Sequence, residues 1–161
     1  MKKLVSVFTV FCMILALCLS LAACGGGESH EVTKSAAEIY NAVAAAGKFG
    51  GMTPVPARDL SDVYGIDAAK IEDSAWYMSE NPSLNADEVA VFKVSDAAYA
   101  AELTTLLQGR IARQLEVAET YSPDEAAKLK AAQVVTVGNW VYYCVGTENA
   151  AMMDVFRAEI G

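Results

Sequence analysis

The apolar run from Leu4 to Leu21 divides this chain of 161 residues into a targeting segment and a part that can fold. Two lysines precede the run and small residues follow it, which is the pattern of a secretory signal peptide. A transmembrane anchor is the alternative, but it needs roughly 20 apolar residues and suitable flanks. We therefore expect residues 1–23 to be removed, which leaves the 138 residues 24–161 for one domain of ordinary size.

The four residues Leu21-Ala22-Ala23-Cys24 resemble a bacterial lipobox. The resemblance implies cleavage before Cys24, a diacylglyceryl thioether on its sulfur, and a new N-terminus that is acylated, for example with palmitate. Two or three acyl chains hold a protein stably at a membrane, whereas one chain does not. An ordinary thiol at a secretory cleavage site is the alternative. With the lipid in place, we expect residues 24–33 to tether the folded part to the extracytoplasmic face of the cell membrane.

The balance of charge argues against nucleic acid as a partner. The chain has 12 basic and 20 acidic residues, a formal charge of −8, and the loss of Lys2 and Lys3 with the signal peptide makes the remaining chain more acidic. Nucleic acids are bound by clustered basic surfaces, and the sequence contains no such cluster. The expected partners are therefore the membrane, through the lipid on Cys24, and another envelope protein or a cell-wall component.

Catalytic and metal-binding motifs are missing from the sequence. The only histidine, His30, lies in the tether, so a Ser-His-Asp or Cys-His arrangement lacks its base. We find no glycine motif for phosphates or dinucleotides, and one histidine with one free cysteine makes no zinc set. We expect no catalytic residue, no metal and no cofactor. A carboxylate-dependent hydrolase is kept as an alternative, because paired acids can cleave glycosidic bonds.

Hydrophobic periodicity, capping residues and turn residues predict helices that alternate with pairs of strands. Gly138-Asn139 is a turn pair that favours a hairpin. We predict helices over 35–47, 97–119 and 148–160, a shorter helix from 122, a helical turn at 59–65, a loop over 48–56, and strands over 70–79, 88–94, 134–137 and 140–145. This order indicates a single α+β domain over residues 34–161, with an antiparallel sheet of about four strands, two hairpins, packed against helices in two layers.

The last predicted strand, residues 140–145, is apolar on both sides. Alternation sends Trp140 and Tyr142 to one face of the sheet and Tyr143 to the other. Aromatic residues on one face can pack in the core or form an exposed platform for sugar rings or peptides. Cys144 is interpreted as a buried structural thiol, with a reactive thiol as the alternative.

One charged residue lies on the apolar side of the helix predicted over 97–119. At about 100° per residue, Arg110 points in the same direction as Gln114, and Tyr121 would follow them. A buried guanidinium needs partners, because leaving it without them costs several kcal/mol. Two interpretations stay open. Arg110 is either a structural residue bonded to a carboxylate or to loop carbonyls, or an anion-binding residue at the rim of a cleft, helped by Gln114 and Tyr121.

Several short motifs accompany the lipobox, namely Ala37-Glu38-Ile39-Tyr40, Tyr64-Gly65-Ile66, Asp87-Glu88-Val89-Ala90-Val91-Phe92, Arg110 through Gln114 to Tyr121-Ser122-Pro123, and Gly138-Asn139-Trp140-Val141. With these motifs the chain resembles a family of uncharacterised lipoproteins of Gram-positive bacteria that carries only a domain-of-unknown-function label. The resemblance implies an envelope location and a single domain, and it implies no activity. We interpret the chain as a non-enzymatic binding or interaction module of the cell envelope. The alternatives are a small anionic-ligand-binding accessory protein of a transporter and the carboxylate-dependent hydrolase.

Overall fold

The computed structural model describes residues 32–161, which form one compact unit. The predictions for the signal peptide, Cys24 and His30 lie outside the described residues. Within them the elements are α2 (Ala36–Ala46), β1 (Met52–Pro54), α3 (Asp59–Asp62), the 3-10 turn η1 (Ala68–Lys70), β2 (Ile71–Ser79), β3 (Glu88–Val94), α4 (Ala97–Tyr121), α5 (Pro123–Lys130), β4 (Gln133–Val137), β5 (Trp140–Val145) and α6 (Asn149–Ile160). None of the described helices combines the length and the apolar character needed to span a membrane.

The strands form one antiparallel sheet in the order β1-β2-β3-β5-β4, which confirms the predicted α+β class. The predicted hairpin β4–β5 is present, and Gly138 takes a φ of 56° in its turn, a conformation that residues with a side chain rarely adopt. The sheet has five strands rather than about four. The additional strand is β1, in the stretch predicted to be a loop, and its Pro54 is tolerated because β1 lies at the edge of the sheet.

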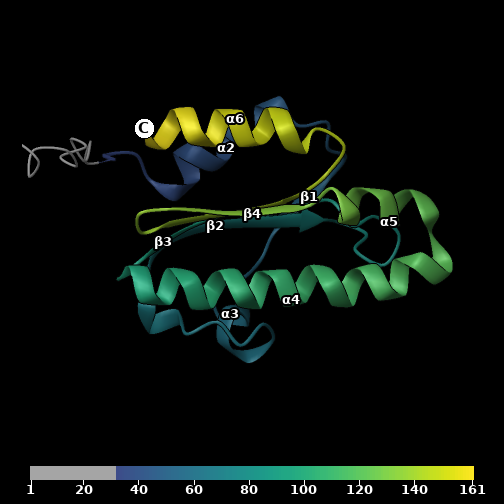
Figure 1. Ribbon diagram of the computed structural model, residues 1–161, viewed down its shortest axis with the longest axis horizontal. Coiled ribbons are helices and arrows are strands. Elements are labelled where there is room, and N and C mark those ends of the chain that lie inside the picture. The colour runs from purple at the N-terminus through teal and green to yellow at the C-terminus, as the bar shows by residue number, and fades with distance from the viewer. Residues whose placement is uncertain (1–31) are drawn as a thin grey trace, which may run out of the picture. The chain divides into compact units, whose positions relative to one another are not determined.

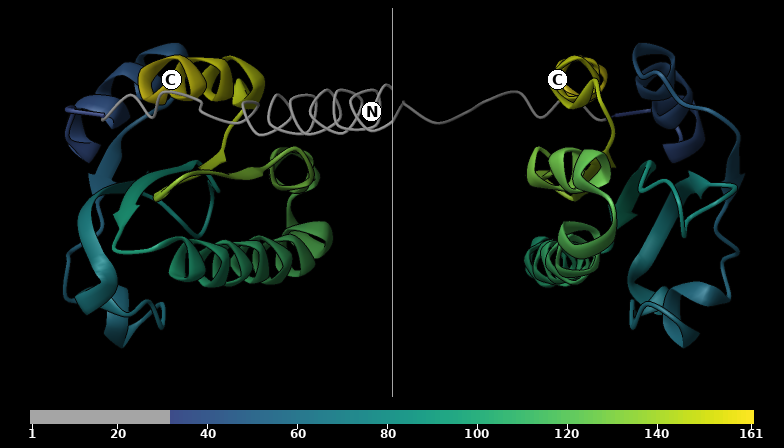
Figure 2. Two further views of the ribbon diagram at one scale, coloured as in Figure 1. Left: turned by 60° about the vertical axis from the view of Figure 1, so that its left-hand side comes forward. Right: turned by 90° about the vertical axis from the view of Figure 1, so that its right-hand side faces the viewer.

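Helices cover both faces of the sheet (Figure 1). One face carries α2 and α6, and the opposite face carries α3, α4 and α5. The side views in Figure 2 show the same division. The prediction of two layers is therefore wrong. The physical reason is that the central strands are apolar on both sides, so each face has to be covered by helices to exclude water.

The two faces of the sheet carry separate hydrophobic cores. Strand β5 contributes to both, and all six of its residues are buried. Trp140 and Tyr142 face α2 and α6, whereas Tyr143 faces α4, as the alternation predicts. Tyr142 stacks on Phe156 of α6 with ring centroids 4.6 Å apart. Neither face is an exposed aromatic platform. Because both cores lie within residues 32–161, we expect this unit to fold by itself.

Local signals fix where the helices begin and end. Ser35 and Glu38 form the predicted capping box of α2, and the Asp96 carboxylate accepts a hydrogen bond of 2.8 Å from the Tyr99 N–H at the start of α4. Pro123 occupies the first turn of α5, where a missing N–H costs nothing. The chain therefore leaves α4 at Ser122 and returns along it as α5, which packs against α4.

Gly109 gives the first prediction, because it lies inside α4 without a positive φ. A Cβ at this position would meet only the Arg113 Nη1 atom, at an ordinary 3.4 Å. Gly109→Ala should raise the free energy of unfolding by about 0.5–1 kcal/mol, because alanine loses less backbone entropy than glycine. The measurement is urea denaturation of residues 32–161. Gly138→Ala is the control, and it should lower the same quantity by about 1–2 kcal/mol, because its φ is positive. Destabilisation by Gly109→Ala would contradict the open packing described for this position.

Candidate functional site

Glu88, the first residue of β3, is a carboxylate with only 1% of its side chain exposed. It sits between the sheet and α4 and accepts hydrogen bonds from four side chains, the longest of them from Gln114 Nε2 at 3.4 Å. Trp76 donates its Nε1–H at 2.6 Å, and the Tyr143 hydroxyl donates at 3.0 Å. Arg110 of α4 donates through Nε at 3.0 and 3.1 Å and through Nη2 at 3.0 Å. The buried negative charge is thus fully compensated.

Arg110 is largely buried, with 19% of its side chain exposed. Its guanidinium carbon lies 4.8 Å from the centroid of the Tyr64 ring and 5.6 Å from that of Trp76. Burial alone would lower the pKa of Arg110, but the charge of Glu88 outweighs it and raises the pKa. The structure therefore agrees with the first of the two interpretations, a structural arginine. Arg110 is paired with the Glu88 carboxylate and ties α4 to the sheet.

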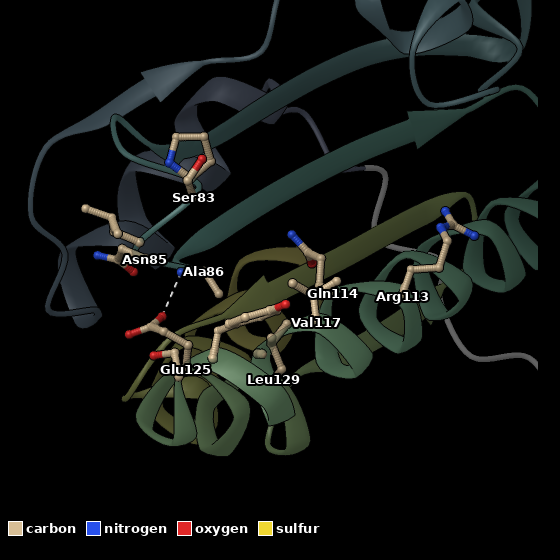
Figure 3. A pocket seen from close by; sticks show the side chains of 13 residues that line it. Ser83, Asn85, Ala86, Arg113, Gln114, Val117, Glu125 and Leu129 are labelled. Carbon is tan, nitrogen blue, oxygen red and sulfur yellow. Dashed lines mark hydrogen bonds between the residues drawn. The ribbon is translucent and has the colours of Figure 1, made fainter.

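A cavity of about 450 Å³ lies beside this network, between the loop that follows β2, the C-terminal half of α4, and α5 (Figure 3). This volume is within the range of pockets that hold small ligands. The residues that line it are Pro82, Ser83, Leu84, Asn85, Ala86, Arg113, Gln114, Val117, Ala118, Tyr121, Ser122, Glu125 and Leu129.

The rim of the cavity is unusually apolar for a protein surface. Among the described residues, five large hydrophobic side chains are exposed, and three of them, Leu84, Val117 and Tyr121, line this cavity. Their exposed fractions are 79%, 60% and 81%. Leu129, which is buried, lies at the bottom. Clustered exposed apolar groups mark surfaces that bind a ligand or a partner.

The loop wall of the cavity is held in place by α5. The Glu125 carboxylate accepts a hydrogen bond of 2.7 Å from the Ala86 N–H, drawn in Figure 3, and pairs with Lys128 at 3.0 Å. Lys128 also donates to Asp87 at 2.8 Å and to Asn85 at 3.0 Å. Burial would lower the pKa of Lys128, but its hydrogen bonds to Asp87 and Glu125 outweigh this and raise the pKa. The cavity is therefore largely preformed.

The structure brings together two of the three residues predicted for a ligand site. Gln114 and Tyr121 both line the cavity, and Arg110 does not. The cation at the cavity is Arg113, which the sequence analysis missed because it lies off the apolar stripe of α4. Gln114 also reaches the Glu88 network, since its Nε2 lies 3.4 Å from a Glu88 oxygen. The sequence offers no signal for Arg113 other than its position next to Gln114.

The structure also places the remaining candidates for chemistry. Glu125 is the only carboxylate that lines the cavity, so the cavity holds no pair of acids. Burial raises the pKa of the Cys144 thiol to about 11, which is the behaviour of a structural cysteine. Within residues 32–161 no group of three or more His, Cys, Asp or Glu side chains is arranged to hold a metal ion.

A family model described as a domain of unknown function, DUF4358, matches residues 45–146. The match includes all five strands together with α3, α4 and α5, and therefore the Glu88 network and the cavity. It confirms the domain-of-unknown-function label that the motifs indicated. No curated protein and no solved structure matches the chain.

Removal of the buried charge at Glu88 gives the second prediction. Glu88→Gln would leave the Arg110 guanidinium without its anion and place an amide among donors, so the free energy of unfolding should fall by about 3–5 kcal/mol. Glu116→Gln is the matched control, because Glu116 lies on the solvent-exposed side of α4. It should change the free energy of unfolding by less than about 0.5 kcal/mol. Urea denaturation of residues 32–161 measures both. Equal effects of the two variants would contradict the central role of Glu88.

Proposed function

The chain belongs to the DUF4358 family, a domain of unknown function. We propose that it is a non-enzymatic binding module, which holds the apolar part of a small ligand in the cavity between residues 81–87, α4 and α5. The observation that carries this proposal is the clustering of Leu84, Val117 and Tyr121, which are exposed to water and surround one cavity. A ligand that covers them removes apolar surface from water, which stabilises the complex by about 25 cal/mol per Å².

The other groups at the cavity suit binding better than catalysis. Ser83, Asn85, Gln114 and Ser122 offer neutral polar groups, which in ligand pockets fix the orientation of a bound molecule. The single lining carboxylate, Glu125, already accepts from Ala86 and Lys128. The hydrolase alternative would need a second acid at the cavity.

We further propose that the module is a lipoprotein of the cell envelope, anchored through Cys24. The support is the sequence pattern of a basic start, an apolar run and a lipobox. Seven residues separate Cys24 from Val32, so the compact unit begins at most about 29 Å of chain from the lipid. The acidic domain repels anionic head groups, and the lipid rather than the protein surface would hold it at the membrane.

The cavity is tested with the uncharged fluorescent dye Nile red and residues 32–161. The dye should bind, and Val117→Gln and Leu84→Gln should each weaken binding about five- to tenfold, because each removes apolar contact area at the rim. Val63→Gln is the matched control, since Val63 is 64% exposed and does not line the cavity. It should leave the affinity unchanged. If the three variants behave alike, the cavity is not the binding site.

The anchor is tested by metabolic labelling with a palmitate analogue in a bacterial host. The full chain should be labelled and found with the membranes, and Cys24→Ser should lose both the label and the membrane association, because the thioether cannot form. Cys144→Ser should keep both, since this thiol is buried. A label that survives in Cys24→Ser would exclude the proposed lipid attachment.

A further inference from the structure

Arg113 gives the cavity a positively charged end. We propose that the ligand is a small amphipathic monoanion, whose apolar body lies against Leu84, Val117 and Tyr121 and whose carboxylate pairs with Arg113. This inference rests on the proposed function and adds the chemical class of the ligand to it.

The first support is that the charge of Arg113 is not matched. Residues 32–161 contain ten basic side chains, and eight of them have a carboxylate within 4.0 Å. Lys70 has none, but its ammonium lies 4.9 Å from the centroid of the Tyr99 ring. Arg113 is the only one of the ten with neither kind of partner. In a chain with 20 acidic residues, an Arg without a partner at a cavity is available to an anion from outside.

The second support is the distribution of charge along the cavity. In Figure 3, Arg113 and Glu125 lie toward opposite ends, with Gln114 and Val117 between them. Glu125 is neutralised by Lys128 and bonded to the loop, so it adds no free negative charge. The electrostatic field of the cavity is therefore set by the guanidinium at the other end, which favours an anionic group there.

Gln114 supplies a hydrogen-bond donor next to this charge. Its Nε2 lies 3.4 Å from Glu88 Oε2, and its Oε1 lies 3.3 Å from the Tyr143 hydroxyl. Both distances exceed the usual upper limit of about 3.2 Å, so the network beneath it holds the amide only weakly. Rotation of the side chain would let Nε2 donate to a bound carboxylate while Glu88 keeps its bonds to Arg110 and Trp76.

The apolar body is as necessary as the anionic group. The whole chain carries a charge of −8, so a bare anion is repelled at long range. An ion pair with an exposed Arg is screened by solvent and contributes little by itself. Burial of an aliphatic or aromatic body against the three exposed side chains adds the affinity that the ion pair lacks. The cavity thus selects anions that carry an apolar group.

The probes are octanoate and 1-octanol, which share a chain and differ in charge, measured by displacement of Nile red from residues 32–161. Octanoate should bind about three- to fivefold more tightly than octanol. Arg113→Gln should bring this ratio to about one, and Arg157→Gln on the opposite face should leave the ratio unchanged. In Arg113→Glu, octylammonium should be preferred to octanoate beyond the preference seen in Arg157→Glu. Both positions are exposed, so the variants should fold.

Equal affinities of octanoate and octanol, or a ratio that Arg113→Gln does not change, would overturn this inference. In that case binding of Nile red that depends on Val117 would leave the proposed function standing. If neither the dye nor either probe binds, the proposed function and the inference both fail.

Discussion

The ion pair between Glu88 and Arg110 fixes α4, one wall of the cavity, on the sheet. Glu88 begins β3, the central strand of the sheet, and Arg110 lies near the middle of α4. Trp76 of β2 and Tyr143 of β5 donate to the same carboxylate. One buried charge therefore holds three adjacent strands and one helix at fixed distances. A buried ion pair adds little net stability by itself, but removal of one partner leaves a buried charge without compensation and lowers the stability. The pair therefore favours the one packing of α4 on the sheet in which both charges meet.

The position of the cavity follows from this connection and from Pro123. Because α4 is fixed on the sheet at Arg110, its last turns extend past the beginning of β3, where the loop between β2 and β3 lies. Pro123 ends the helix, and α5 returns to meet that loop through Glu125 and Lys128. The space between them cannot close, since both walls are anchored independently. A structural network thus lies a few residues away from the cavity that it helps to shape.

Local features of the fold are readable in the sequence, and long-range ones are not. The capping box at Ser35 and the turn at Gly138 involve residues that are neighbours in the chain, and both are confirmed. Strand β1 is three residues long and contains Pro54, so its pairing with β2 leaves no periodic pattern. The sequence does not predict helices on both faces of the sheet, because alternation along β5 leaves open whether one set of its aromatic residues faces water. For the site, helical periodicity grouped Gln114 and Tyr121 correctly, but it cannot show that a loop 30 residues earlier faces Arg113 rather than Arg110.

The edges of the sheet have a consequence for a protein that would be concentrated on a membrane. An unpaired edge strand offers its backbone groups to a second chain, which leads to aggregation. Strand β1 presents only three residues at one edge, and Pro54 lacks an N–H to offer. The other edge strand, β4, is five residues long, and its Thr136 hydroxyl shares a hydrogen bond of 2.8 Å with the Thr104 hydroxyl of α4, which packs on one face of the sheet. At the β1 edge, neighbouring molecules crowded on one surface would therefore find little backbone with which to extend the sheet.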